Sequence, residues 1–75
     1  MMTMKTIDAT GLACPLPLLK AKQGLHQIDS GERLLVIATD AGSVRDFHAF
    51  IDLTDHQLIE FEETAIDYRY LIQKG

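Results

Sequence analysis

The chain has 75 residues, of which 47% are hydrophobic and 24% are charged, and its formal net charge is -4. We expect a single domain over residues 1–75 with a thin core, because a chain of this length buries only about 60% of the surface that it exposes when unfolded. The negative charge disfavours direct nucleic-acid binding, since proteins that bind nucleic acid usually present a basic surface. No apolar run approaches the roughly 20 residues that span a bilayer, so we expect no membrane partner.

Cys14 is the only cysteine of the chain. It cannot form an internal disulfide, and the three histidines show no shared ligand spacing with it, so we expect neither a metal ion nor a cofactor. The first residues lack the apolar stretch of a secretion signal. An unpaired thiol suits the reducing cytosol, and we therefore predict a cytoplasmic protein.

The first third of the chain predicts a strand followed by a helix. Residues 4–9 form the expected strand, with Ile7 pointing inward. From Pro15 onward, apolar residues recur at spacings of three and four, which is typical of an amphipathic helix. These residues are Leu18, Ala21, Leu25 and Ile28. Close packing on a sheet would explain Gly24 within this helix, and Gly31 is suited to a left-handed cap at its end.

The middle of the chain predicts a buried strand and a second helix. Residues 34–38 are almost continuously apolar, as expected for a central strand that is covered at least partly on both faces. Ser43 is expected to cap the second helix, with Asp46 three residues later in an arrangement close to a capping box. The apolar side of this helix comprises Val44, Phe47, Phe50 and Ile51.

Two further strands are predicted at residues 57–63 and 67–74. In the first, alternation places Ile59 and Phe61 on one face and Leu58 on the other. In the second, Tyr68, Tyr70 and Ile72 alternate with Arg69, Leu71 and Gln73. Leu58 and Leu71 are therefore expected on the face away from the helices, where they would form an exposed apolar patch for a partner.

The predicted order of elements is βαβαββ. Two amphipathic helices and four strands favour the α+β class, as a two-layer α/β sandwich. Right-handed crossovers would place both helices on one face of a four-stranded mixed sheet.

The segment around Cys14 predicts a thiol at a helix N-terminus. Gly11 lets the backbone turn toward Cys14, and Pro15 favours an extended Cys14 that suits an N-cap. We expect Pro15 at the first helical position and Pro17 at the third. N–H groups in the first turn of a helix have no intrahelical partner, so the missing N–H groups of the prolines do not break the helix. The positive end of the helix dipole would then lower the thiol pKa below its usual value.

Two neighbours are expected to support the thiolate. Because both prolines lack an N–H group, the backbone N–H of Leu16 is the donor expected nearest the sulfur. Lys22, two turns into the helix, would add positive potential. Arg45 is interpreted as a solvated residue, and Asp40 and Asp46 as capping and dipole-compensating residues of the second helix.

Residue type alone favours another interpretation of Cys14, since a lone cysteine is most often a small buried hydrophobe. The alternative function is then a non-catalytic regulatory or interaction module that uses its sheet face and has a structural cysteine. A thioredoxin-like reductase or peroxidase is disfavoured because no Cys-x-x-Cys is present. The reactivity of the native thiol distinguishes a nucleophilic cysteine from a structural one.

Residues 11–20, Gly-Leu-Ala-Cys-Pro-Leu-Pro-Leu-Leu-Lys, resemble the CPxP signature of the TusA/SirA-type sulfur-carrier family. The similarity continues through residues 30–32, the apolar strand to Ile37, and residues 39–40, 45–46 and 68–72. The resemblance implies a two-layer α/β sandwich with βαβαββ order. Leu16 stands where members of the tRNA-thiolation branch often carry an acidic residue, so the tRNA role is not transferred.

The resemblance also implies a role for Cys14, which would accept a sulfur atom as a persulfide and pass it on by sulfurtransferase-type chemistry. The implied donor is a cysteine desulfurase or a rhodanese-type sulfurtransferase, and the implied recipient is a downstream sulfur-acceptor protein. The absence of a second cysteine suits this role, because a resolving thiol would expel the sulfur as sulfide and form a disulfide. The resemblance leaves the pathway open, and with it the classification of the carrier as an enzyme.

Overall fold

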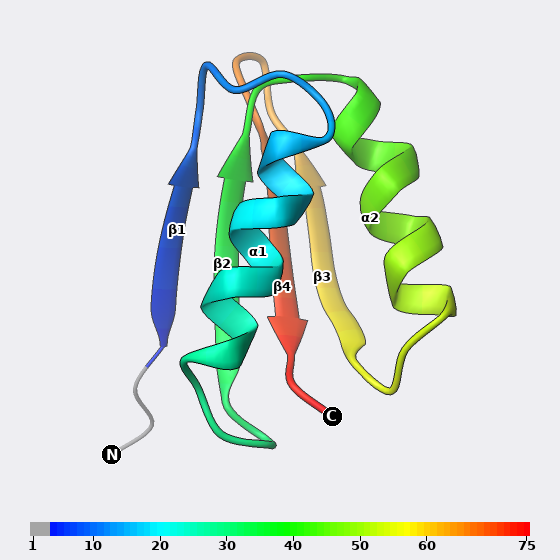
Figure 1. Cartoon of the computed structure of the whole chain (residues 1–75). Coiled ribbons are helices and arrows are strands. Elements are labelled where there is room, and N and C mark those ends of the chain that lie inside the picture. The colour runs from blue at the N-terminus through cyan, green and yellow to red at the C-terminus, as the bar shows by residue number, and fades with distance from the viewer. Residues whose placement is uncertain (1–3) are drawn as a thin grey trace.

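The computed structural model describes residues 4–75, which fold into two helices and four strands (Figure 1). The elements are β1 Lys5–Ala9, α1 Leu16–His26, β2 Arg33–Ala38, α2 Gly42–Asp52, β3 Gln57–Glu63 and β4 Tyr68–Gln73. This order confirms the predicted βαβαββ arrangement. Residues 1–3 lie outside the described residues. The expectations of one domain over residues 1–75 and of no secretion signal rest partly on them.

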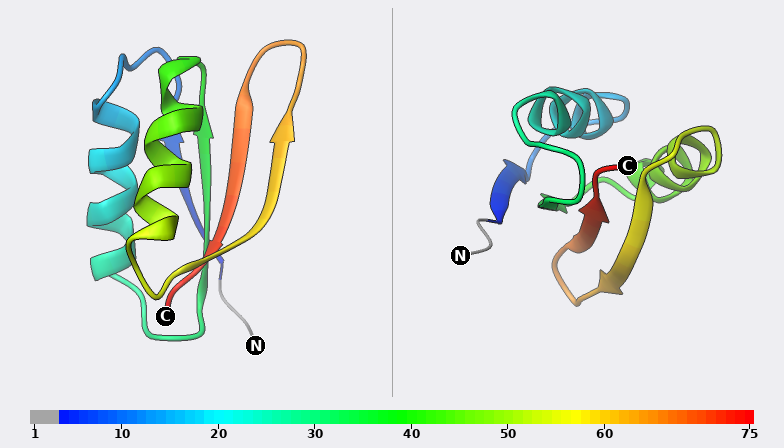
Figure 2. Two further views of the ribbon diagram at one scale, coloured as in Figure 1. Left: turned by 90° about the vertical axis from the view of Figure 1, so that its right-hand side faces the viewer. Right: turned by 90° about the horizontal axis from the view of Figure 1, so that it is seen from below.

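The four strands form one mixed sheet in the order β1-β2-β4-β3. β1 and β2 are parallel, whereas β4 pairs antiparallel with both β2 and β3. Both helices cover the same face, and the other face is open (Figure 2). Because β1 and β2 run in the same direction, the connections that follow them, β1–α1 and β2–α2, leave the sheet at the same end (Figure 1).

The core lies between the sheet and the helices. Alternate residues of β2, Leu34, Val36 and Ala38, are fully buried, which confirms the apolar run as a central strand. The ring of Phe47 stacks on that of Tyr70 from β4, with centroids 4.1 Å apart and planes at 16°. Burial raises the pKa of Tyr70, so its hydroxyl stays protonated and can donate a hydrogen bond.

Close packing explains the glycine within α1. A Cβ atom at Gly24 would lie 3.1 Å from side-chain atoms of both Ile7 and Leu34. Without that atom, α1 can approach β1 and β2 closely, and its neighbours Ala21 and Leu25 are buried. Gly31 has the predicted left-handed conformation, with a φ of +89°, but it does not cap α1, because the helix already ends at His26 with Gln27 as a right-handed C-cap.

β3 departs from the predicted alternation. Its pairing with β4 is irregular between Leu58 and Glu60, so one extra residue is inserted into the strand. Leu58 and Phe61 consequently both pack against the core, while Ile59 is 40% exposed. The prediction of Leu58 on the open face was therefore wrong, because an inserted residue reverses the side to which all earlier residues of a strand point.

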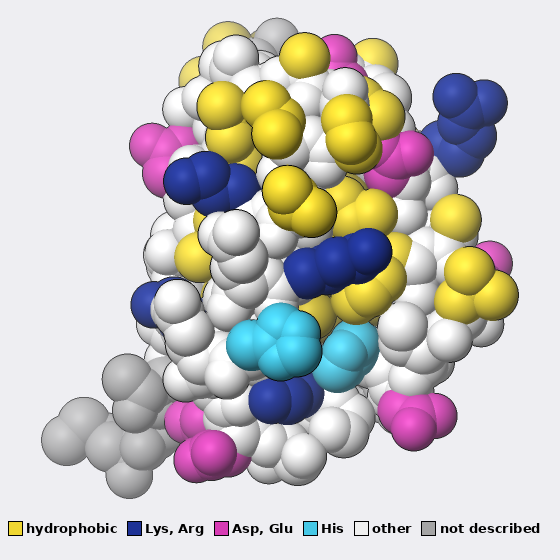
Figure 3. Space-filling view, viewed as in Figure 1, with side chains coloured by type: hydrophobic (Ala, Val, Ile, Leu, Met, Phe, Trp, Pro, Cys, Tyr) yellow, Lys and Arg dark blue, Asp and Glu magenta, His cyan; other side chains and the backbone are white. Residues whose placement is uncertain are grey.

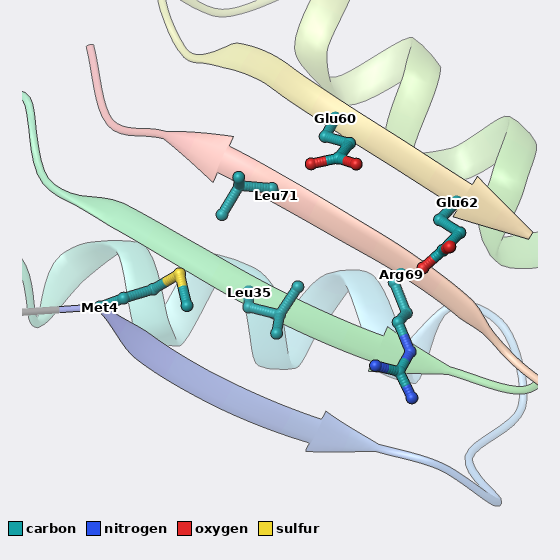
Figure 4. A pocket seen from close by; sticks show the side chains of 6 residues that line it. All are labelled: Met4, Leu35, Glu60, Glu62, Arg69 and Leu71. Carbon is teal, nitrogen blue, oxygen red and sulfur yellow. The ribbon is translucent and has the colours of Figure 1, made fainter.

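The open face of the sheet carries a shallow hollow of about 240 Å³ (Figure 4). It is lined by Met4, Leu35, Glu60, Glu62, Arg69 and Leu71. Leu71 lies on this face as predicted and shares the hollow with Met4 and Leu35, and the charged side chains of Glu60, Glu62 and Arg69 complete its lining. Cys14 does not line the hollow.

The connection between β3 and β4 contains no Gly, Pro or Asn and is closed instead by Thr64 and Asp67. The Thr64 hydroxyl donates to Asp67 Oδ1 at 2.6 Å and accepts from the Asp67 N–H at 2.9 Å. Arg69 Nε lies 3.3 Å from Asp67 Oδ1. The hydrogen bond from Thr64, followed by that from Arg69, lowers the pKa of Asp67, so its carboxylate remains charged in the turn.

Candidate functional site

Cys14 lies in the β1–α1 connection, two residues before α1, and its side chain is exposed. The helix begins at Leu16 with Pro15 at the N-cap position and Pro17 second in the helix. The predicted cap therefore moves by one residue, because the Leu16 N–H donates to the Ala13 carbonyl at 2.9 Å and closes a turn before the helix. The Cys14–Pro15 peptide bond is cis.

Two hydrogen bonds join the loop of Cys14 to the loop that follows β2. The Cys14 N–H donates to Asp40 Oδ2 at 3.2 Å, and the Gly11 N–H donates to Thr39 Oγ1 at 2.9 Å. Asp40 Oδ2 also accepts the Gly42 N–H of its own loop at 3.1 Å. Gly11 has a φ of +78°, which confirms the predicted turn toward Cys14.

Gly42 allows α2 to approach the cysteine. A Cβ atom at this position would lie 2.9 Å from Asp40 Oδ2, 3.2 Å from Cys14 Cβ and 3.7 Å from Cys14 Sγ. Any larger residue would have to displace the side chain of Asp40 or Cys14. The first turn of α2 is therefore part of the wall beside the thiol.

The thiol of Cys14 donates a hydrogen bond to Asp46 Oδ2. This hydrogen bond is the main reason that the pKa of Cys14 is raised, and lost hydration and the negative charges of Asp46 and Asp40 act in the same direction. The positive charge of Arg45 opposes them. The expectation of a lowered thiol pKa was therefore wrong: a full carboxylate charge in hydrogen-bond contact outweighs the partial charge of a helix end.

The contact of Asp46 with the thiol was not predicted, because its position in the sequence suggested a helix cap. α2 begins at Gly42 with Ala41 at the N-cap position, and the Asp40 carboxylate accepts the N–H of Gly42, as predicted for a capping residue. Ser43 is instead buried, with its hydroxyl 2.8 Å from the Tyr70 hydroxyl. A signal was nevertheless present, since parallel neighbouring strands bring the loops at their carboxyl ends together.

The two residues expected to support the thiolate act elsewhere. The Leu16 N–H is committed to the Ala13 carbonyl. The Lys22 ammonium group lies over the Phe50 ring, 5.4 Å from its centroid. Arg45, interpreted from the sequence as solvated, is the cation that affects Cys14.

Exposed apolar side chains lie near the thiol, in addition to its charged neighbours. Leu16 and Leu19, in the first turn of α1, are 46% and 50% exposed. In Figure 3, hydrophobic side chains gather at the end of the molecule where the β1–α1 connection lies in Figure 1. A groove of about 250 Å³ is lined by Leu18, Lys22, Asp46, Ala49, Phe50 and Leu53, so it reaches the carboxylate that contacts the thiol.

The arrangement can perform thiol chemistry with a second molecule. The single free thiol is accessible, and a proton acceptor is in contact with it. Among residues 4–75, no group of three or more His, Cys, Asp or Glu side chains is placed to hold a metal ion. In the same part of the chain, neither helix is long and apolar enough to cross a membrane.

Comparison with known proteins finds relatives in two ways. A family model described as sulfurtransferase TusA matches residues 5–74. The chain is also 50% identical over 69 residues to the sulfur carrier protein TusA of Allochromatium vinosum, a match that covers 92% of this chain and 91% of that protein.

Proposed function

The chain belongs to the TusA sulfurtransferase family, and we propose that it acts as a sulfur carrier that holds its cargo as a persulfide on Cys14. The observation that supports this assignment most directly is the exposure of the only thiol at the junction of β1 and α1. A structural cysteine would instead lie in the core, where the described residues have aliphatic and aromatic side chains.

Loading is a transfer of one sulfur atom between two thiols. The Cys14 thiolate attacks the terminal sulfur of a donor cysteine persulfide, forming a new S–S bond while the donor S–S bond breaks. The donor cysteine leaves as a thiolate, and the Cys14 proton passes to Asp46 or to water. The transferred sulfur retains its oxidation state, so the step needs no external oxidant or reductant.

Asp46 controls how readily this attack begins. Its hydrogen bond favours the protonated thiol, so the thiolate fraction of the free carrier at neutral pH is small. A thiolate of higher pKa is also the stronger nucleophile once it forms. The free carrier therefore reacts slowly with adventitious oxidants, and a donor that neutralises the Asp46 charge would activate it.

The other predicted site residues have supporting roles. Gly11 turns the loop, and Pro15 and Pro17 restrict the backbone on either side of the first helical residue. Leu16 offers apolar contact next to the thiol. Lys22 forms part of the groove that leads away from Asp46.

A sulfur relay requires a donor and an acceptor. We propose a cysteine desulfurase or a rhodanese-type sulfurtransferase as donor and a downstream sulfur-acceptor protein as recipient, in the reducing cytosol that suits an unpaired thiol. The exposed leucines beside Cys14 are suited to such docking, because apolar surface that is removed from water favours association.

The test is sulfur loading followed by intact mass measurement. The purified protein is incubated with a cysteine desulfurase and cysteine, or with a rhodanese and thiosulfate, and analysed without reductant. We expect a gain of one sulfur atom that is reversed by reductant and absent from Cys14→Ser. The circular dichroism of Cys14→Ser should match that of the native protein. A persistent sulfur gain in the folded variant, or no gain with either donor, would contradict the proposal.

A further inference from the structure

A second pocket lies at the end of the helical layer away from the β1–α1 loop. It has a volume of about 300 Å³ and is lined by Lys22, Leu25, His26, Phe50, His56 and Lys74. In Figure 3 two histidine side chains lie together on the helical face, with basic side chains on either side of them. Within residues 4–75, no Asp or Glu lines this pocket, although the chain has 11 Asp and Glu against 7 Lys and Arg.

The basic groups of this pocket are held in place and retain donors. The Lys74 ammonium donates to the Ile28 carbonyl at 2.7 Å, which leaves two of its three N–H groups. Lys22 is held over the Phe50 ring. Within residues 4–75, the ion pair between Arg69 and Asp67 is the only one, so neither lysine is neutralised by a described carboxylate.

His56 is oriented by the backbone. Its Nδ1 accepts the Gly75 N–H at 3.0 Å, which assigns the ring proton of the neutral imidazole to Nε2. That Nε2–H has no hydrogen-bond acceptor among the described residues. The ring also lies 5.6 Å from the Phe50 ring, centroid to centroid, and the buried Leu25 completes an apolar wall.

We propose that this pocket binds a small organic anion, in which a carboxylate or phosphate group is attached to a flat apolar body. The head group would accept hydrogen bonds from Lys22, Lys74 and His56, and charge-assisted bonds of this kind are the stronger ones. The apolar body would pack on Phe50 and Leu25. Cys14 does not line this pocket, although Lys22 and Phe50 border both the pocket and the groove that reaches Asp46.

The test is a titration followed by nuclear magnetic resonance of the imidazole and backbone amide signals. Benzoate and phenyl phosphate are the probes, and benzamide is the uncharged control. We expect saturable shifts at His26, His56 and Lys74 with the two anions and none with benzamide. Binding of either anion supports the site, and the tighter one identifies the preferred head group.

Variants distinguish a built site from general attraction to positive charge. Lys22→Gln and Lys74→Gln should each weaken anion binding by about tenfold, as expected for one lost charge-assisted hydrogen bond. Lys20→Gln removes the same charge from an exposed position of α1 that does not line the pocket, and should leave binding unchanged. Equal weakening in all three variants, equal binding of benzamide, or an absence of saturable shifts would overturn the proposal.

Discussion

The two ends of the helical layer differ in the charged side chains that border them. At the thiol end, Asp40 and Asp46 approach Cys14 and raise its pKa. At the other end, the pocket bordered by Lys22 and Lys74 has no Asp or Glu among its described lining residues. Residues of both helices border both regions, together with Cys14 and Asp40 at one end and His56 and Lys74 at the other. A cluster of cations next to Cys14 would instead lower the thiol pKa and favour the thiolate.

The largest expected effect comes from the core that underlies both ends. Phe47→Ala removes a fully buried ring that stacks on Tyr70, and should lower the free energy of unfolding by about 3–5 kcal/mol. Urea denaturation followed by circular dichroism measures the change. Phe47→Leu is the control and should cost less than about 1.5 kcal/mol if apolar volume is the main requirement. Similar losses in the two variants would mean that ring stacking matters more than the filled volume.

The next prediction removes the acidic character of the thiol end. Asp46→Asn takes away the charge that holds the thiol protonated, so the Cys14 pKa should fall and alkylation at neutral pH should accelerate. The profile of the iodoacetamide reaction rate against pH should shift as a whole to lower pH. Asp52→Asn, an exposed position near the end of α2, should leave the profile in place. An unchanged profile in Asp46→Asn would show that another group determines the thiol pKa.

The same contact links stability to pH. The folded thiol pKa lies above that of the unfolded chain, so the folded state retains the proton more tightly. The resulting stabilisation is present below the ordinary thiol pKa and is lost as the pH rises through the raised value. Urea denaturation below the ordinary thiol pKa and above the raised one should therefore show that the free energy of unfolding of the native protein decreases with pH. The decrease should be smaller in Asp46→Asn.

A smaller change of opposite sign is expected at Arg45. Its positive charge is the one influence that lowers the Cys14 pKa, and Arg45→Gln should raise that pKa further and slow alkylation at neutral pH. Lys20→Gln removes an equal charge from α1 and serves as the control in the same assay. If the Arg45 and Asp46 variants shift the profile in the same direction, altered packing rather than charge is the cause.

The smallest effect tests whether the two ends are independent. Lys22→Gln should leave the pH profile of Cys14 alkylation unchanged, because Lys22 is not among the groups that shift the thiol pKa. The identical variant should impair anion binding at the other end. A lower alkylation rate in Lys22→Gln would contradict this independence, because it would show that the charge of Lys22 also affects the thiol.

The sequence by itself determined the elements and their layers. Apolar periodicity located α1, β2 and β4, and the lack of other cysteines restricted thiol chemistry to Cys14. These features are local in the chain, since a helical or strand period is set by neighbouring residues. The close packing of Gly24 was also predictable, because a glycine within a helix otherwise lowers its stability.

Only the tertiary structure decided the surroundings of the thiol. Asp46 lies 32 positions from Cys14, and its local sequence is equally suited to a helix cap. The parallel pairing of β1 with β2 brings the two loops together, and no local pattern encodes which side chain then meets the sulfur. The inserted residue in β3 was hidden for the same reason, because it is defined by register with β4. A thiol pKa depends on charges in space, so the sequence indicated the nucleophile and the fold set its protonation.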